Sequence, residues 1–367
     1  MIASHILGLG TAVPSYAVEQ DAFALNLANA MGLNEGQKSL LIRLFKNTQI
    51  QNRYTVVPDY QRDFQRGELY HSSFPKCIPG SLERNAIYKI AAPELAAQAA
   101  IKALKEWGGE PQEITHVISV SCTGMMAPGI EFLLVDQLAL PRSCSKLGVN
   151  FMGCFGAFRG LAVARSFSLE NPNHRILLVC TELCSLHMQM TQDKSSFISN
   201  ALFSDGAAAV VVGACPKPLE KPLWEIRKFS SYAIADSKEE MTWEIGNHGF
   251  VMGLSEKTPL LFKKEIYEFC KALVQHQTSL SNCLWAPHPG GKAILNAIAA
   301  VCGLDSELDF KSSWHVLRNF GNMSSATFLF VLEEMLKAQV SGAKDWSIGL
   351  GFGPGLDLEG VLLKNVF

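Results

Sequence analysis

In its first half the chain reads Asn150-Phe151-Met152-Gly153-Cys154-Phe155-Gly156-Ala157, and in its second half it reads Asn319-Phe320-Gly321-Asn322-Met323-Ser324-Ser325-Ala326. Each segment begins a stretch of small and apolar residues that predicts a helix. A turn rich in Gly and Asp follows each unit, and after it comes an apolar strand, at Ala207–Val212 in the first half and Leu358–Leu363 in the second. The repeat predicts two similar units whose helix N-termini meet near a pseudo-twofold axis.

The rest of the chain alternates between strand-like and helix-like patterns. Apolar runs rich in β-branched residues predict buried strands at His5–Leu9, His116–Ser121, Arg175–Cys180, Ala207–Val212, Ser347–Leu350 and Gly360–Leu363. Helical patterns lie at Ala91–Trp107, Phe155–Phe167, Lys263–His276, Gly291–Cys302 and Ser325–Ala338. This alternation predicts an α/β fold with largely buried sheets. A split near Gly213 predicts one unit over residues 1–213 and a second over residues 214–367.

Composition excludes several classes of protein. Hydrophobic residues make up 48% of the 367 positions and charged residues 18%, which is typical of a globular protein. The formal net charge is −2, so we expect neither nucleic acid nor an anionic membrane surface as a partner. The longest apolar run, Gly206 to Cys215, is shorter than the ~18–20 residues that span a bilayer. The N-terminus has no basic flank of a signal peptide. We therefore expect a cytoplasmic protein.

Among the ten cysteines, Cys154 has an unusual setting. The cysteines form no C-x-x-C pair and no zinc spacing, so neither a metal site nor a disulfide framework is expected. Most should be small buried hydrophobes. A thiol at a helix N-terminus, as predicted for Cys154, would be stabilised as a thiolate and would suit thioester chemistry. A buried structural cysteine is the alternative.

His288 and Asn322 are two further candidates. His288 lies between two prolines and ahead of two glycines, in a turn that allows little freedom. Such a turn suits a residue that contacts a ligand, although a purely structural turn histidine is the alternative. Asn322 has the pattern of a helix N-cap, and its side-chain amide could instead donate to a developing oxyanion.

Together these residues resemble a known family. Cys154, His288 and Asn322, in the contexts Gly-Cys-Phe-Gly-Ala, His-Pro-Gly-Gly and Gly-Asn-Met-Ser-Ser, are similar to the catalytic trio of type III polyketide synthases of the chalcone-synthase-like family. Gly351-Phe352-Gly353-Pro354-Gly355 and Ala201–Ala209 resemble two further signatures. The resemblance covers essentially the whole chain, and Met241–Gly246 looks more like bacterial members.

The resemblance implies a thiolase fold, in which two α/β halves form a five-layer αβαβα arrangement, normally as a homodimer. It implies that Cys154 takes a starter acyl group from acyl-CoA, with His288 as the ion-pair partner of its thiolate. His288 and Asn322 would hold malonyl-CoA during decarboxylation and Claisen condensation. The chain would cyclise to a pyrone, resorcinol or phloroglucinol-type product. Coenzyme A thioesters would be substrates, and no cofactor would be tightly bound.

The resemblance also implies residues around the substrate. Phe203 matches a gatekeeper, and the second gatekeeper is expected at Met252, or at Phe250 two residues away. Arg43 and Lys46 correspond to the basic mouth of a coenzyme A tunnel. Further positions in the cavity wall are Cys122, Thr123, Cys184, His187, Trp243 and Ser324.

For all these positions core packing or a surface charge is the alternative. Trp243 occupies a position that is small in plant chalcone synthases. It would either shorten the cavity or turn aside and admit a long acyl starter.

Two other functions remain open. A ketoacyl synthase III-like enzyme, which uses acyl carrier protein, also has Cys, His and Asn. That family typically shows His-Gln-Ala-Asn where this chain has His288-Pro289-Gly290-Gly291. An inactive scaffold homologue is the second alternative, and the presence of all three catalytic residue types argues against it.

Overall fold

A mixed β-sheet forms the centre of the structure and contains every strand predicted above. The computed structural model covers residues 2–366 apart from 62–63, 65–66, 71–73, 256 and 339–343. The strands of the sheet are β1 (Ser4–Ala12), β4 (His116–Ser121), β5 (Ser145–Asn150), β6 (Arg175–Leu183), β7 (Asp205–Ala214), β8 (Trp224–Ala233), β11 (Cys283–Pro287), β12 (Trp346–Gly353) and β13 (Asp357–Asn365). They are hydrogen-bonded in the order β11-β12-β13-β8-β1-β7-β6-β4-β5.

Strand β1 joins the two halves of this sheet. It pairs with β7 of its own half along most of its length, and Ser4–Ile6 also pair with Trp224–Ile226 of β8. Strands β6 and β7 are buried along their whole length, because their small and β-branched residues are covered on both faces. The two halves of the fold therefore share a continuous hydrogen-bonded sheet.

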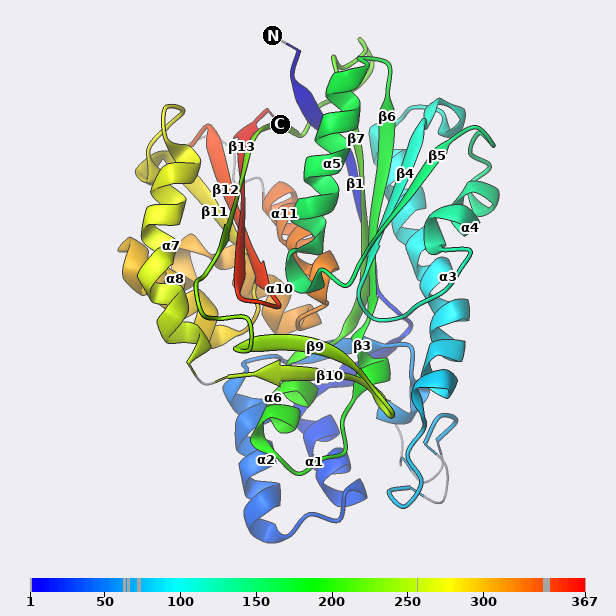
Figure 1. Ribbon diagram of the computed structural model, residues 1–367, viewed down its shortest axis with the longest axis vertical. Coiled ribbons are helices and arrows are strands. Elements are labelled where there is room, and N and C mark those ends of the chain that lie inside the picture. Colours follow the sequence, from blue (N-terminus) through cyan, green and yellow to red (C-terminus); the bar gives the residue numbers. More distant parts are fainter. Residues whose placement is uncertain are drawn as a thin grey trace.

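Helices lie in three layers on and between the two halves of the sheet (Figure 1). The central helices are α5 (Gly156–Glu170) and α11 (Thr327–Lys337), which pack in a shared core with residues of both halves, among them Ile118 and Val361. Helices α3 (Ser81–Trp107) and α4 (Ile130–Gln137) cover the outer face of one half. Helices α7 (Thr258–Val274) and α8 (Lys292–Cys302) cover the other. The result is the expected five-layer αβαβα arrangement.

The predicted helices are present, with shifted ends. α3 begins at Ser81 rather than at Ala91 and continues through Pro93. A short 3-10 turn, η7 (Ser324–Ala326), precedes α11. None of the described helices is long and apolar enough to cross a membrane.

Smaller elements gather at one end of the sheet and close the region below the central helices (Figure 1). They are α1 (Gln20–Ala30), α2 (Glu35–Asn47), α6 (Lys194–Leu202), and the pairs β2 (Tyr16–Glu19) with β3 (Asn52–Thr55) and β9 (Met241–Gly246) with β10 (Gly249–Leu254). Helices α9 (Ser306–Asp309) and α10 (Lys311–Phe320) lead from α8 to Asn322. The N-termini of α5 and α11 face this end.

Candidate active site

Cys154 lies in the 3-10 turn η4 (Gly153–Phe155), directly before α5. Gly153 has φ +67, and a Cβ built on it would fall 2.5 Å from Cδ of Pro354. A glycine is therefore required next to the thiol, because both the backbone conformation and the space exclude a side chain. The contact also explains how the Gly-Phe-Gly-Pro-Gly loop reaches the site. The Cys154 side chain is 8% exposed.

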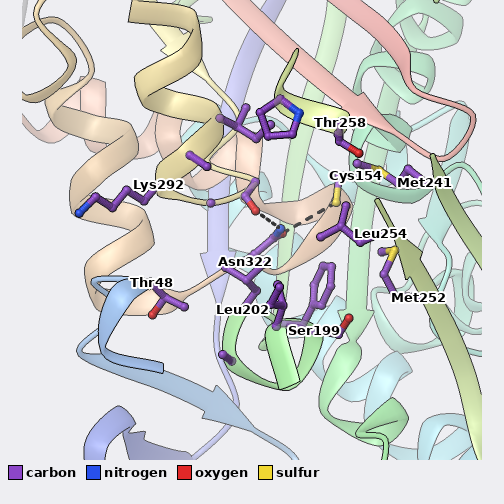
Figure 2. A pocket seen from close by; sticks show the side chains of 18 of the residues that line it. Thr48, Cys154, Ser199, Leu202, Met241, Met252, Leu254, Thr258, Lys292 and Asn322 are labelled. Carbon is purple, nitrogen blue, oxygen red and sulfur yellow. Dashed lines mark hydrogen bonds between the residues drawn. The ribbon is translucent and has the colours of Figure 1, made fainter. Parts of the chain in front are cut away.

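Asn322 takes the corresponding place in the second half, directly before η7 and α11. Its Oδ1 accepts a hydrogen bond from the Ser324 N–H at 2.9 Å and lies 3.9 Å from Sγ of Cys154. Its backbone N–H donates to the Leu202 carbonyl at 3.0 Å, which ties it to the end of α6. The N-cap prediction is wrong in position, because Met323 and Ala326 are the N-cap residues of η7 and α11 and Oδ1 only stabilises the turn that leads into η7. Nδ2 of Asn322 points to the Gly290 carbonyl at 3.5 Å (Figure 2).

His288 follows β11 and is fully buried. Its backbone N–H donates to the Leu350 carbonyl at 2.7 Å, and its ring meets Phe352 edge-on at 5.4 Å. Gly290 keeps this turn tight, because a Cβ there would fall 2.6 Å from the Phe352 ring. Within the described part of the chain, neither ring nitrogen has a hydrogen-bond partner. Buried polar atoms are nearly always paired, so these nitrogens indicate a site for a ligand.

One cavity of about 300 Å³ brings the three candidates together. Cys154, His288 and Asn322 all line it, as do Phe203 and Met252. Figure 2 shows Cys154, Asn322 and Met252 around this cavity. The remaining wall comes from α2, α6, α7, α8 and the β9–β10 hairpin and is mainly apolar. The structure thus joins residues from both halves of the chain at the ends of the two central helices.

The basic residues expected at the mouth do not line this cavity. Arg43 and Lys46 are exposed on α2, whereas their neighbours Leu44, Asn47 and Thr48 face the cavity. The helical period places Lys46 on the face opposite to positions 44 and 48, whereas Arg43 lies one turn before Asn47 on the same side of the helix. Their assignment to the mouth of a coenzyme A tunnel stays a prediction.

Burial sets the protonation of the site. It raises the pKa of Cys154 to about 12, and hydrogen bonding by Ser324 and Asn322 offsets this only in part. Burial also lowers the pKa of His288 to about 3. Burial thus favours the neutral thiol of Cys154 and the neutral imidazole of His288. Desolvation thus opposes the thiolate that the helix N-terminus is expected to stabilise, and the thiolate stays a prediction.

Behind Cys154 the cavity nearly closes. Cys122, Thr123, Cys184, Trp243 and Ser324 line a hollow of only about 20 Å³, together with Cys154, Phe203 and Met252. Nε1 of Trp243 donates to the Cys122 carbonyl at 2.6 Å. This hydrogen bond holds the indole in the wall of the hollow, an arrangement that favours the shortened cavity over an indole turned aside.

His187 and Phe250 lie beyond this indole and line a separate hollow of about 30 Å³. Nε2 of His187 is 2.7 Å from the Thr123 carbonyl, which can only accept, and Nδ1 receives the Phe250 N–H at 2.9 Å. These partners assign the proton to Nε2. Burial lowers the pKa of His187 to about 3, so this histidine is a neutral support. Of the two positions considered for the second gatekeeper, Met252 lines the main cavity and Phe250 does not.

Sequence reasoning missed a buried carboxylate next to the site. Glu182, at the end of β6, accepts hydrogen bonds from the Cys122 N–H at 3.0 Å, from Oγ1 of Thr123 at 2.8 Å and from the Ser325 hydroxyl. Burial raises its pKa. In the sequence, Glu182 stands two residues after the apolar strand Arg175–Cys180. A charged residue at that place could have indicated a buried carboxylate. Across the described residues, no cluster of three or more His, Cys, Asp or Glu side chains is arranged to hold a metal.

Comparison with known proteins assigns the family. The family profile "Chalcone and stilbene synthases, N-terminal domain" matches residues 2–216, and the corresponding C-terminal profile matches residues 225–367. "Type III polyketide synthase A" of Arabidopsis thaliana is 31% identical over 98% of this chain and 92% of its own length. "Probable polyketide synthase 1" of Dictyostelium discoideum is 34% identical over 99% of this chain, which spans only 11% of that protein.

Solved structures agree with this assignment. The C-terminal type III polyketide synthase domain of Steely1, a type I/III hybrid from Dictyostelium, superposes with a TM-score of 0.92 at 31% identity, with both chains fully covered. PKS-I from the brown alga Ectocarpus siliculosus superposes with a TM-score of 0.93 at 28% identity, over 100% of this chain and 99% of its own. With both halves matched and Cys154, His288 and Asn322 gathered in one cavity, the chain belongs to the chalcone and stilbene synthase family of type III polyketide synthases.

Proposed function

We propose that this protein builds a polyketide on Cys154, using an acyl-CoA starter and malonyl-CoA. The observation that carries the proposal is the single cavity lined by Cys154, His288 and Asn322. A thiol nucleophile, a buried imidazole without partners and a side-chain amide are the groups that acyl transfer and enolate stabilisation require. Family membership supports acyl-CoA as the class of substrate.

Loading of the starter requires movement of one proton. Because burial favours the neutral forms of Cys154 and His288, we assign to His288 the removal of the thiol proton as Sγ attacks the starter carbonyl. The new carbon–sulfur bond forms on Cys154, and the bond to the coenzyme A sulfur breaks. His288 then returns the proton to the departing coenzyme A thiolate. In this step His288 acts as a general base.

Extension then forms one carbon–carbon bond. Asn322 and His288 donate to the thioester oxygen of malonyl-CoA as carbon dioxide leaves and an enolate develops. The enolate carbon attacks the acyl carbonyl on Cys154, and the bond from that carbonyl to Sγ breaks. The chain leaves on coenzyme A, longer by two carbons, and can reload onto Cys154.

The cavity behind the nucleophile favours few extensions. The hollow beyond Cys154 measures about 20 Å³, and Trp243 closes it. A long chain has little room there before it cyclises. We therefore infer a short polyketide that closes to a pyrone, resorcinol or phloroglucinol-type ring.

The test is product formation from labelled malonyl-CoA and a panel of acyl-CoA starters, followed by liquid chromatography and mass spectrometry. The wild-type protein should give labelled ring products, and Cys154→Ala should give none while still releasing carbon dioxide from malonyl-CoA. A matched control is Cys270→Ala, which removes a buried thiol on α7 that does not line the cavity. Full product from Cys154→Ala would refute the nucleophile assignment.

We also propose that the protein is a homodimer formed across β5. This strand is at the edge of the sheet, and its residues are mostly exposed. Exposed apolar side chains of Met125, Phe132 and Leu147 lie on or next to it, beside a hollow of about 420 Å³. An exposed edge strand with apolar neighbours is a ready surface for a second copy.

Sedimentation equilibrium tests the homodimer. The wild-type protein should show twice the 40.2 kDa chain mass, and Leu147→Lys should shift the population toward one chain mass. A wild-type protein that stays at one chain mass at all concentrations would contradict the proposal.

A further inference from the structure

Two cysteines form a pair at the contact between α7 and α8, outside the catalytic cavity. Cys270 lies in the last two turns of α7, and Cys302 is the last residue of α8. The two helices pack side by side on one outer face of the sheet (Figure 1). Cys270 is part of the apolar core beneath them, and Cys302 packs against that core. Neither cysteine is among the described residues that line the 300 Å³ cavity.

The two thiols contact each other. A hydrogen bond joins the Cys270 and Cys302 side chains across the helix contact. This hydrogen bond lowers the pKa of Cys302, while the same contact and burial raise the pKa of Cys270. Cys302 is therefore the thiol of the pair that ionises first, and the neutral Cys270 thiol donates to the sulfur of the resulting thiolate.

The two thiols also differ in exposure. Cys270 is fully buried, whereas Cys302 is half-buried at the C-terminal end of α8, where Gly303 with φ +69 ends the helix. A reagent in solution therefore reaches Cys302 first. A partly exposed thiol of lowered pKa beside a second thiol is the arrangement found in redox-sensing cysteines.

A third thiol in the same core has a different setting. Cys283, at the start of β11, is fully buried, and its Sγ donates to the Ser279 carbonyl at 3.4 Å. Burial raises its pKa to about 12. Cys283 is therefore a poor nucleophile, although it belongs to the same apolar core as Cys270.

We propose that Cys270 and Cys302 are a reversible redox site, which a disulfide oxidant such as oxidised glutathione converts to an intramolecular disulfide. The ionised sulfur of Cys302 attacks one sulfur of oxidised glutathione and breaks its sulfur–sulfur bond, and one reduced glutathione leaves with the Cys302 proton. The Cys270 sulfur then attacks the mixed disulfide at Cys302. The bond between the two residues forms, and the second reduced glutathione leaves with the Cys270 proton. Two electrons pass from the two thiols to the oxidant.

The bond would join two helices that also form the wall of the catalytic cavity. Thr258 and Pro259 of α7 and Ala293 and Ile294 of α8 line that cavity, and all four are in the first turns of their helices. The two cysteines are near the opposite ends, so the disulfide forms without occupying the cavity. The inference goes beyond the proposed function, and its test needs no polyketide substrate.

The test is peptide mass spectrometry of the full chain after incubation with oxidised glutathione. The reaction is quenched in acid, free thiols are blocked, and the protein is digested without reductant. The wild-type protein should yield the Cys270 peptide linked to the Cys302 peptide, and dithiothreitol should remove the link. Cys270→Ser should accumulate glutathione on Cys302, because the second thiol that displaces it is missing. Cys302→Ser should leave Cys270 unmodified.

Controls separate this pair from the other thiols. Cys283→Ser removes the third thiol of the core and should leave the link unchanged. Cys77 and Cys215 are exposed and should take up glutathione in every variant, which shows that the oxidant reacts. A wild-type protein without a link between Cys270 and Cys302 would overturn the proposal, and so would a link from Cys302 to Cys283. The wild-type result decides the question even if a variant fails to fold.

Discussion

Replacing Trp243 with alanine removes the ring that separates the hollow behind Cys154 from the one beside His187. The two hollows measure about 20 and 30 Å³, and Trp243 lines both. Without the indole they merge into one space that also includes the volume of the ring. We expect the variant to make polyketides with more malonyl units than the wild-type protein.

The cost in stability follows from the contacts that are lost. The indole donates one hydrogen bond to the Cys122 carbonyl, worth about 1 kcal/mol. It also meets His187 edge-on at 5.5 Å and Phe250 at 5.8 Å, and each such pair contributes roughly 0.5–1.5 kcal/mol. The free energy of unfolding should fall by roughly 2–4 kcal/mol, which leaves a folded enzyme given typical values of about 5–15 kcal/mol.

The assay is mass spectrometry of the products formed from labelled malonyl-CoA, with denaturant unfolding in parallel. Trp243→Phe is the matched control, because it keeps a ring in the hollow and removes only the N–H donor. It should keep the wild-type chain length and lose about 1 kcal/mol. An unchanged chain length in Trp243→Ala, or equal lengthening in both variants, would refute the role of the indole as a wall.

Three further predictions concern the nucleophile and its supports. Asn322→Ala should slow decarboxylation of malonyl-CoA by about 10²–10³, the usual effect of losing one oxyanion donor. An unchanged rate would mean that Asn322 has only a structural role in the turn before η7. Because burial raises the pKa of Cys154 to about 12, its thiolate fraction grows as the pH rises. Its alkylation by iodoacetamide, followed by peptide mass spectrometry, should therefore accelerate about tenfold per pH unit between roughly 7 and 10, whereas a plateau already at pH 7 would indicate a resting ion pair. Arg53→Lys should lower the free energy of unfolding by roughly 1–3 kcal/mol, because one Arg53 nitrogen donates to the carbonyls of both Asn200 and Phe203. An unchanged urea unfolding midpoint would exclude this stabilising role.

Local patterns in the sequence predicted the layered fold. The strand at Arg175–Cys180 and the helix at Gly291–Cys302 are near their predicted places, because apolar periodicity reports which face is buried. The start of α3 was missed by ten residues, since Ser81–Ile90 precede Pro93, a residue that usually marks the beginning of a helix. The pairing of β1 with β8 joins segments from both halves, and no local pattern encodes it.

The candidate site was predicted from motifs, and its details depend on contacts between distant segments. The hydrogen bond from Trp243 to the Cys122 carbonyl decides which way the indole turns, and it joins residues 121 positions apart. The protonation of Cys154 depends on burial by both halves, which a helix N-terminus in the sequence does not reveal. Which residues of α2 line the cavity depends on how this helix packs, and the sequence around Arg43 does not reveal that packing. Glu182 stood in the sequence as a charge beside an apolar strand and could have been identified.

The central claim is that Cys154 carries the growing chain. The most direct measurement is peptide mass spectrometry of the protein after brief incubation with an acyl-CoA starter and labelled malonyl-CoA, quenched in acid. We expect an acyl group on the peptide that contains Cys154, with added labelled two-carbon units, and none on that peptide in Cys154→Ala. Labelled product without any adduct on Cys154, or an adduct on another cysteine alone, would contradict it.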